Sequence, residues 1–197
     1  AIELSDALKN VGCDNIRIDI DEDTVTLLKD NISVDPGGAA KGYIADRIAD
    51  HLKTQSITGA IINMGGDMYL YGCKEDGSLF NIGINDPDKN GCIMSLYVSD
   101  CAVATSGTYE RCFTKDGIFY HHILDPATGM SAATDIRSVT VISKSCVDSD
   151  CLCTVCILLG SKNALDLINS LRDTEAVMIL NDASVVMSKD ASRYIRQ

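Results

Sequence analysis

The sequence contains no tryptophan and few other aromatic side chains. Aromatic residues make up 5% of its 197 residues, so its core has to be built from aliphatic residues, alanine and methionine. Basic side chains are also scarce: 17 Lys and Arg stand against 28 Asp and Glu, a formal net charge of −11. That balance argues against a nucleic-acid partner, because phosphate backbones are bound by clustered cations. It does not oppose chemistry on a phosphate whose charge is screened by a metal ion.

Long apolar runs are missing as well. No stretch approaches 18 consecutive apolar residues, so we expect no transmembrane segment. No signal peptide is visible either. The chain begins with Ala1 and runs directly into a helical pattern, so we interpret it as a processed or truncated part of a longer protein. Its length fits one large domain or two small ones.

Nine cysteines are many for this length. An odd number cannot all pair, and no repeated Cys-x-x-Cys spacing of the zinc type occurs. Cys151, Cys153 and Cys156 lie at different angles around a helix and do not converge on one centre. We therefore expect reduced, mostly buried cysteines that pack as small apolar residues. This fits a reducing cytosol or an anaerobic habitat better than an oxidising exterior.

The hydrophobic periodicity predicts both helices and strands. Ile44, Ile48 and Leu52 recur every four residues, with Ala45 and Ala49 beside them, and give the helix over residues 39–55 an apolar face. Further helices are expected over residues 3–11, 147–159, where Gly160 ends the helix, and 163–171. Strands are expected over residues 15–21, 24–28, 60–63, 69–71, 80–84, 93–98, 119–123, 139–142, 176–180 and 185–187. Short turns between the strands predict an α+β fold with a largely antiparallel sheet.

Polar or glycine-rich runs lie at the edges of several apolar segments, and we expect them to converge as loops on one site. In residues 35–42, Gly37 and Gly38 precede a helix whose N-terminus favours an anion, and Lys41 adds a positive charge. The spacing is not that of a P-loop, and an ordinary tight turn with a cap is the alternative.

In the second run, residues 63–67, two glycines permit positive φ angles and let a ligand approach the backbone. Asn63 is there either a turn former or a ligand contact. The densest run is Thr105–Arg111, and it is followed by His121 and His122 at the end of a strand. Their side chains should point to opposite faces, so at most one faces a given site.

Asp150 and Thr154 are four residues apart on a predicted helix and share one face. A carboxylate and a hydroxyl are oxygen donors of the kind that Mg²⁺ prefers. A magnesium site completed by water and substrate phosphate is therefore one interpretation. The alternative is a capping Asp and a solvated Thr.

Five segments, in order, resemble the ApbE family of FAD:protein FMN transferases. Residues 35–42 are similar to Asp-x-Gly-Gly-x-Ala-Lys-Gly, residues 63–67 to Asn-x-Gly-Gly-Asp and residues 150–154 to Asp-Ala-Leu-Ser-Thr. Residues 104–111 and 122–129 match the family closely. The resemblance spans about residues 33–160. It implies that residues 1–197 are the C-terminal major part of an ApbE-like domain, without its N-terminal segment.

The resemblance implies a Mg²⁺-dependent enzyme that cleaves FAD. It would attach FMN through a phosphoester bond to a Thr or Ser of a target flavoprotein, a subunit of a membrane redox complex, and release AMP. Asp150 and His122 would be catalytic, with His122 near the flavin phosphates. The metal ligands would be Asp150, Thr154 and the backbone carbonyl of Ala40. The expected FAD-binding residues are Gly37, Gly38, Lys41, Asn63, Gly65, Gly66, Asp67, Thr105, Ser106, Gly107 and His122.

Two alternative functions use the same residues. One is an FAD-binding or scavenging protein without transfer activity, and the other is an FAD pyrophosphatase that gives FMN and AMP. The resemblance also implies export and a lipid anchor at the cell envelope through an N-terminal segment, whereas the nine cysteines favour the cytoplasm. Because the family's flavin pocket is shared with that segment, we expect this chain to bind FAD more weakly than a longer protein.

Overall fold

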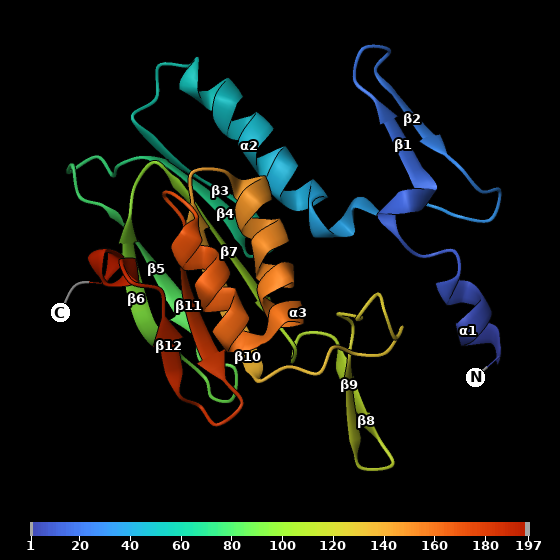
Figure 1. Ribbon diagram of the computed structural model, residues 1–197. Helices are drawn as coiled ribbons and strands as arrows, with labels where there is room; N and C mark the ends of the chain where they lie inside the picture. The colour runs from blue at the N-terminus through green and yellow to red at the C-terminus, as the bar shows by residue number, and fades with distance from the viewer. Residues whose placement is uncertain (1, 196–197) are drawn as a thin grey trace.

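A six-stranded sheet forms the centre of the protein in a computed structural model that describes residues 2–195 (Figure 1). The strand order is β12-β11-β10-β7-β4-β3, and every neighbouring pair is antiparallel. The strands are β3 (Gly59–Met64), β4 (Asp67–Gly72), β7 (Cys101–Gly107), β10 (Ile136–Ser143), β11 (Glu175–Leu180) and β12 (Val185–Met187). The predicted α+β fold with a largely antiparallel sheet is confirmed.

Two helices, α2 (Ala40–Lys53) and α3 (Cys146–Ser170), lie on one face of this sheet (Figure 1). The core beneath α3 includes Val139, Val141 and Met178, and that beneath α2 includes Ile62 and Tyr69. The opposite face is covered by the antiparallel pair β5 (Phe80–Asn85) and β6 (Cys92–Val98), and by the short 3₁₀ helix η3 (Ala191–Tyr194). The sheet is therefore buried on both faces, which explains the predominance of apolar residues in its central strands.

Helix α2 buries the alanine side of its predicted apolar face more deeply than the isoleucine side. Ala45 and Ala49 are fully buried, whereas Ile44 and Ile48 are 43% and 38% exposed. Leu52 is half-buried. Small side chains on the inner face let the helix axis approach the sheet and α3 closely, and this turns the isoleucines towards the edge of the contact.

Helix α3 joins the two helices predicted over residues 147–159 and 163–171. Gly160 lies between them with a φ of 73°, a left-handed conformation that interrupts the helix as expected. By length and composition alone, α3 is apolar enough to cross a membrane. No such segment is expected from the sequence, because polar residues interrupt every apolar run before 18 residues. In the structure, Cys153, Ile157 and Ile168 pack in the core against the sheet.

Strand β7 is a central strand that the sequence analysis did not predict. Residues 105–107 were expected in a loop, but they continue the apolar run 101–104 and pair with β10 along its length. The polar residues 105–107 belong to the strand because they pair with residues 138–140 of β10, while β4 pairs with residues 101–103 on the other edge. One expected site loop is therefore part of the rigid sheet.

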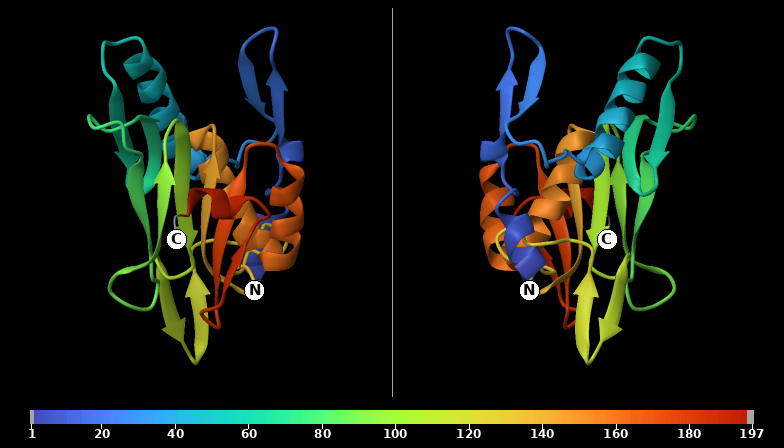
Figure 2. Two further views of the ribbon diagram at one scale, coloured as in Figure 1. Left: turned by 90° about the vertical axis from the view of Figure 1, so that its left-hand side faces the viewer. Right: turned by 90° about the vertical axis from the view of Figure 1, so that its right-hand side faces the viewer.

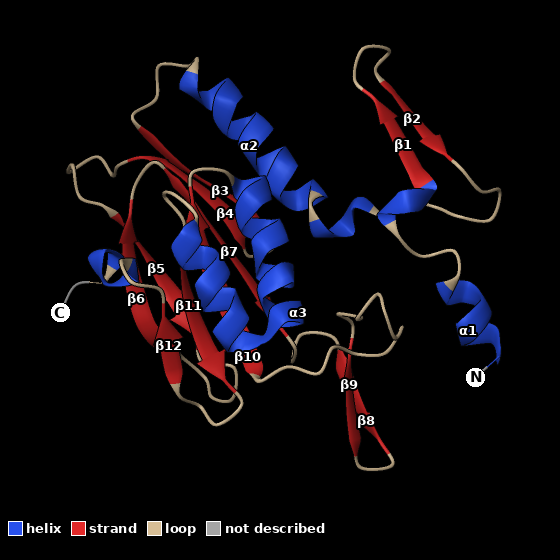
Figure 3. Ribbon diagram, in the orientation of Figure 1, coloured by secondary structure: helices blue, strands red, loops and turns tan. Residues whose placement is uncertain are grey.

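Besides β5–β6, two more two-stranded hairpins lie outside the central sheet (Figure 3). Strand β8 (Cys112–Lys115), which was not predicted, pairs with β9 (Ile118–His121). Near the N-terminus, helix α1 (Ile2–Leu8) precedes the hairpin of β1 (Ile16–Asp19) and β2 (Thr24–Leu27). Short 3₁₀ turns, η1 (Cys13–Asn15) and η2 (Pro36–Gly38), complete the element order.

The β1–β2 hairpin lies apart from the sheet in both views of Figure 2. The alternating isoleucines predicted a half-buried strand, yet Ile18 and Ile20 are 69% and 83% exposed. The prediction of the strand is confirmed, but the prediction of its burial is wrong. Alternation indicates which side chains share a face, and burial needs a second surface to cover that face.

None of the nine cysteines forms a disulfide, and all of them lie within the described residues. The expectation of mostly buried thiols holds for four of them: Cys101, Cys146, Cys153 and Cys156. Cys73 and Cys151 are half-buried. Cys13, Cys92 and Cys112 are exposed, so these three do not act as core residues.

Gly42 offers a test of the contact between α2 and α3. A Cβ atom at this position would lie 2.4 Å from the carbonyl oxygen of Cys146 and 2.5 Å from Cα of Val147. We expect Gly42→Ala to lower the free energy of unfolding by about 1–3 kcal/mol, because the backbones would have to separate. Urea denaturation measures this. Gly38→Ala is the matched control, since nothing lies within 4 Å of its added Cβ; equal stability of the two variants would contradict the close contact.

Candidate functional site

The N-terminus of α3 is capped by a side chain from α2. The carboxylate of Asp46 accepts hydrogen bonds from the backbone N–H of Cys146 at 2.7 Å and of Val147 at 3.0 Å. It also accepts one from the hydroxyl of Ser145 at 3.0 Å, and that hydroxyl in turn accepts from the N–H of Asp148. The free amides of the first turn are thus satisfied across the two helices. This cap fixes how α3 lies against α2.

One turn further along α3, the cap brings Asp150 to the start of α2. The N–H of Gly42 donates to Oδ2 of Asp150 at 3.1 Å, and the thiol of Cys151 donates to the carbonyl oxygen of Gly38 at 3.4 Å. Ala40 opens α2 between these two contacts. The structure therefore places residues 35–42 beside residues 150–154, although more than 100 residues separate them in the chain.

Asp67, Lys41 and Asp150 form a charged cluster at this junction. The ammonium group of Lys41 forms an ion pair with Asp67 and lies 3.5 Å from Oδ1 of Asp150. Both carboxylates are buried, with relative exposures of 2% for Asp67 and 4% for Asp150. Two carboxylates face one ammonium, so the cluster has excess negative charge that a bound cation would neutralise.

The pKa values of Asp67 and Lys41 are shifted in this cluster. Burial is the main cause that raises the pKa of Asp67, and the charge of Asp150 raises it too; Lys41 opposes both effects. For Lys41, burial acts to lower the pKa, but the hydrogen bonds and charges of the two carboxylates outweigh it and the pKa is raised. Lys41 is thus held in its charged form by the carboxylates it separates.

The glycine turn between β3 and β4 has the conformation that the sequence predicted. Gly65 and Gly66 have φ angles of 76° and 110°, and Met64 pairs with Asp67 across the two-residue turn. The side-chain oxygen of Asn63 accepts a hydrogen bond from the N–H of Gly66 at 2.8 Å, so Asn63 acts as a turn former. A Cβ at either glycine would meet no atom within 4 Å, which leaves the turn open to a ligand.

The other glycine pair is partly occupied by its own loop. The N–H of Gly37 donates to the carboxylate of Asp35 at 2.8 Å, which caps η2. This amide is therefore engaged in the described conformation and does not project freely towards an anion. The cap-and-turn alternative accounts for Asp35 and Gly37 as the structure shows them.

Thr105 and Ser106 point to opposite faces of the sheet. Ala104 packs beneath α3 and Val103 packs on the β5–β6 side. Alternation along β7 therefore places the Ser106 side chain on the helix face and the Thr105 side chain on the β5–β6 side. The Thr105 hydroxyl pairs with that of Thr140 at 2.8 Å. Thr105 reaches the charged cluster only through a backbone hydrogen bond to Asp67, which lowers the pKa of that carboxyl.

The adjacent histidines have different surroundings. His121 is buried, with Nε2 3.1 Å from the carbonyl oxygen of Ala132 and Nδ1 accepting from the N–H of Ile123 at 3.3 Å. His122 is exposed, and its backbone N–H donates to the carbonyl oxygen of Arg111 at 3.1 Å. His121 therefore has a structural role, and His122 is the one whose ring is accessible to a ligand.

The donor atoms near Asp150 fit a hard cation. Carboxylate, hydroxyl and carbonyl oxygens are the ligands that Mg²⁺ takes, together with water and phosphate. Thr154 is half-buried one turn after Asp150. Among residues 2–195, no group of three or more His, Cys, Asp or Glu side chains is arranged to hold a metal ion. Asp150 and Thr154 could therefore supply two of the oxygen donors that such a cation needs.

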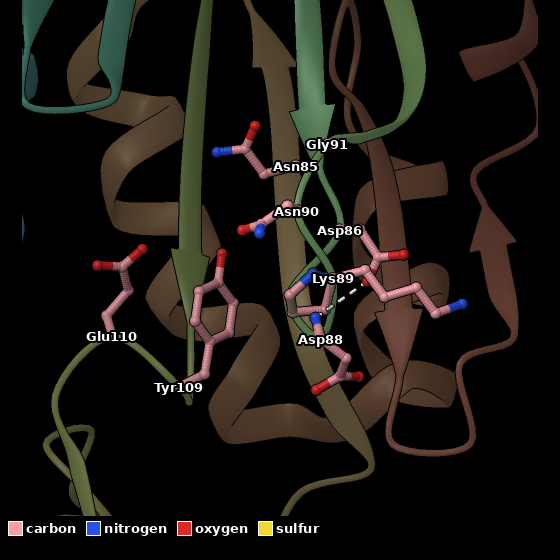
Figure 4. A pocket seen from close by; sticks show the side chains of 9 residues that line it. Asn85, Asp86, Asp88, Lys89, Asn90, Gly91, Tyr109 and Glu110 are labelled. Atoms are coloured by element: carbon pink, nitrogen blue, oxygen red, sulfur yellow. Dashed lines mark hydrogen bonds between the residues drawn. The ribbon is translucent and has the colours of Figure 1, made fainter.

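A separate cavity of about 660 Å³ lies at the far end of β7 (Figure 4). The loop 85–91 forms one side, and Tyr109 and Glu110 form the other. Residues 109 and 110 fall within the run that the sequence analysis singled out, but the loop 85–91 was not anticipated. Its Asn, Asp and Gly residues resemble an ordinary turn between strands, so no local signal distinguishes them.

A second, more apolar cavity of about 540 Å³ lies near the N-terminus, between the end of α1, residues 31–34 and Pro126. None of the predicted site residues lines either cavity. The charged cluster is thus distinct from both hollows in the described part of the chain.

Comparison with known proteins gives one consistent result. The model of the ApbE family matches residues 1–178. The FAD:protein FMN transferase of Treponema pallidum is 37% identical over 172 residues, which cover 82% of this chain and 48% of that protein. The enzyme of the same name from Klebsiella pneumoniae is 36% identical over 173 residues, covering 86% of this chain and 53% of that protein.

Solved structures agree with this comparison. The crystal structure of the ApbE protein of Thermotoga maritima superposes with a TM-score of 0.89 and 32% identity, over 100% of this chain and 64% of that one. The flavin transferase ApbE of Vibrio cholerae gives a TM-score of 0.87 and 29% identity, over 98% and 62% of the two chains. The chain spans about half the length of the transferases it matches.

The charged cluster predicts a pH dependence of stability. A carboxyl whose pKa is raised by folding contributes stability below its unfolded pKa, and this contribution is lost as pH rises through the folded pKa. The pKa of Asp67 is raised from 3.8. We expect Asp67→Asn to remove this loss, so that its free energy of unfolding falls less than that of the wild type as pH rises from 3.8 towards neutrality.

Lys41→Met should have the opposite effect on the pH dependence of the free energy of unfolding. It removes the cation that lowers the pKa of Asp67, so the loss of stability with rising pH should become larger. Urea denaturation at a series of pH values measures both variants. A flatter profile for Lys41→Met than for the wild type would show that the ammonium does not act on Asp67 in solution.

Proposed function

Because the chain belongs to the ApbE family, we propose that it carries the metal- and phosphate-binding part of an FAD:protein FMN transferase. The observation that carries this proposal is the buried cluster of Asp67, Lys41 and Asp150. It lies where three segments that resemble the family meet. The activity is proposed for the longer protein, since the matched transferases are about twice the length of this chain.

In the proposed reaction, a Thr or Ser hydroxyl of the acceptor protein attacks the FMN phosphorus of FAD. A new P–O bond forms to the acceptor, the bond to the AMP oxygen breaks so that AMP leaves with the bonding electron pair, and the proton of the hydroxyl passes to solvent. Such a transfer depends on charge neutralisation and in-line positioning more than on covalent help from the protein. Mg²⁺, when bound, would supply charge neutralisation for this transfer.

Asp150, Thr154 and a backbone carbonyl at the start of α2 would hold the metal. Ala40 is the carbonyl that the resemblance implies. The carbonyl oxygen of Gly38 also faces α3, as its contact with Cys151 shows. Asp67 and Lys41 would set the charge of the site, and the Lys41 ammonium would offer a positive charge to a phosphate oxygen. In this proposal His122 lies near the flavin phosphates, as its accessible ring allows.

We propose that the acceptor belongs to a flavoprotein subunit of a membrane redox complex and that the longer protein acts at the cell envelope. Both follow from the resemblance. The nine unpaired cysteines are compatible with a reducing cytoplasm as the alternative.

The decisive experiment incubates the full-length protein with FAD, Mg²⁺ and a Thr-bearing acceptor peptide. Mass spectrometry of the peptide detects covalent FMN, and chromatography detects free FMN and AMP. FMN on the peptide with an equal amount of AMP supports the transferase. Free FMN with AMP would instead identify a pyrophosphatase, and bound, intact FAD would identify a flavin-binding protein.

Asp150→Ala in the full-length protein tests the metal site. The substitution removes the charged ligand, so we expect the rate of FMN transfer at limiting Mg²⁺ to fall by about 100-fold or more, as for loss of other groups that neutralise transition-state charge. FAD binding should fall less. The exposed Asp148, on the same helix, supplies the control: Asp148→Ala should keep near-normal activity. Wild-type turnover of Asp150→Ala would exclude this residue from the metal site.

A further inference from the structure

Arg137 occupies an irregular position in strand β10. Ile136 pairs with Leu180 and Ser138 pairs with Ile179, so Arg137 is an extra residue opposite two consecutive partners on β11. This is a β-bulge, and bulges redirect the side chain that they insert. The arginine belongs to none of the segments that resemble the ApbE family.

The guanidinium group of Arg137 contacts three separate segments. Nη2 lies 3.1 Å from Oδ1 of Asp88 in the loop between β5 and β6. The guanidinium carbon lies 5.5 Å from the centre of the Tyr109 ring and 5.7 Å from that of Phe119 in β9. A flat cation can pair with a carboxylate while its faces contact aromatic rings, and lysine lacks this geometry.

The backbone of Arg137 holds the same region. Its carbonyl oxygen accepts from the N–H of Thr108 at 3.0 Å and from the Thr108 hydroxyl at 3.3 Å. The Tyr109 ring also packs against Gly107. A Cβ atom at Gly107 would lie 2.4 Å from the ring atom Cε1 of Tyr109. The segment that ends β7 is thus fixed between the glycine backbone and the arginine.

The contact with Phe119 connects the β8–β9 hairpin to the central sheet. The two strands of this hairpin pair only with each other within the described residues. Phe119 lies 6.2 Å from the His121 ring, and the next residue, His122, bonds through its N–H to the carbonyl oxygen of Arg111. The placement of His122 therefore depends on a hairpin that Arg137 ties to β10.

We propose that Arg137 is a positioning residue for flavin transfer. It links the loop 85–91, the end of β7 and the β8–β9 hairpin, and so places His122 relative to the sheet that carries Asp67. This inference rests on the proposed function for its catalytic consequence, whereas the structural link itself stands on the contacts of Arg137. The residue acts through others and does not itself contact the reacting phosphorus.

The test compares Arg137→Lys with Arg137→Met in the full-length protein. The first keeps the positive charge but loses the planar group, and the second loses both. Arg47→Lys is the matched control, because Arg47 also pairs with a carboxylate, Asp50, but on the exposed side of α2. The measurements are kcat and KM for FAD and acceptor peptide, and native-state hydrogen exchange of residues 107–122.

We expect Arg137→Lys and Arg137→Met to lower kcat by about 10- to 100-fold, the loss typical of misplaced groups, with KM for FAD changed less than about 2-fold. Hydrogen exchange in residues 112–122 should become faster in both variants and stay unchanged in Arg47→Lys. Wild-type kcat and exchange in Arg137→Lys would overturn the proposal. An equal increase of exchange throughout the sheet would also overturn it, since this would show general destabilisation.

Phe119→Leu separates the hairpin contact from the ion pair with Asp88. It should accelerate exchange in the hairpin and lower kcat, while the loop 85–91 keeps its protection. If the loop 85–91 also lost protection, the Phe119 contact and the Asp88 ion pair of Arg137 would not be independent, which would contradict the proposal. If the wild-type protein transfers no FMN, the proposed function fails, and the exchange measurements still decide whether Arg137 anchors the hairpin.

Discussion

The capping of α3 by Asp46 is the interaction on which the site depends. One carboxylate on α2 satisfies two backbone amides and a hydroxyl at the start of α3. Free amides at a buried helix end are costly, so this contact fixes both the separation and the register of the two helices. Gly42 permits the close approach that the cap requires. Asp150 lies one turn later on α3 and therefore faces the start of α2, where its carboxylate accepts a hydrogen bond from the Gly42 amide.

Strand β7 runs between the charged cluster and the region around Arg137. On the helix face, its backbone reaches the charged cluster through the hydrogen bond from Thr105 to Asp67. At its end, Gly107 and Tyr109 lead to the cavity lined by residues 85–91 and to the contacts of Arg137. β7 pairs with β10 along residues 102–107 and with β4 along residues 101–103, and positions on a paired strand hold functional groups more accurately than loops do. The charged cluster and the accessible His122 are thus connected through β7, Arg137 and the β8–β9 hairpin.

The buried cysteines are packing residues by their chemistry as well as by their place. Burial raises the pKa of Cys156 and of Cys146 to about 12, so both remain protonated at neutral pH and are poor nucleophiles. Cys153 donates to the carbonyl oxygen of Ala104 at 3.2 Å beneath α3. Cys151 differs because it is half-buried beside Asp150 and bonds to Gly38. The expectation that the cysteines pack as small apolar residues is therefore met by Cys153 and Cys156, which face the sheet.

The sequence by itself determined the helices, most strands, the Gly65-Gly66 turn and the order of the segments that resemble the ApbE family. These features depend on local periodicity and on backbone conformations that few residues adopt. It did not reveal that Thr105–Gly107 belongs to a central strand, that Thr105 and Ser106 face opposite sides, or that Asp46 caps a helix 100 residues away. The exposure of Ile18 and the three contacts of Arg137 were equally hidden. Only the tertiary structure decided these, because strand register, burial and long-range hydrogen bonds depend on which surfaces meet, and no short window of residues contains that information.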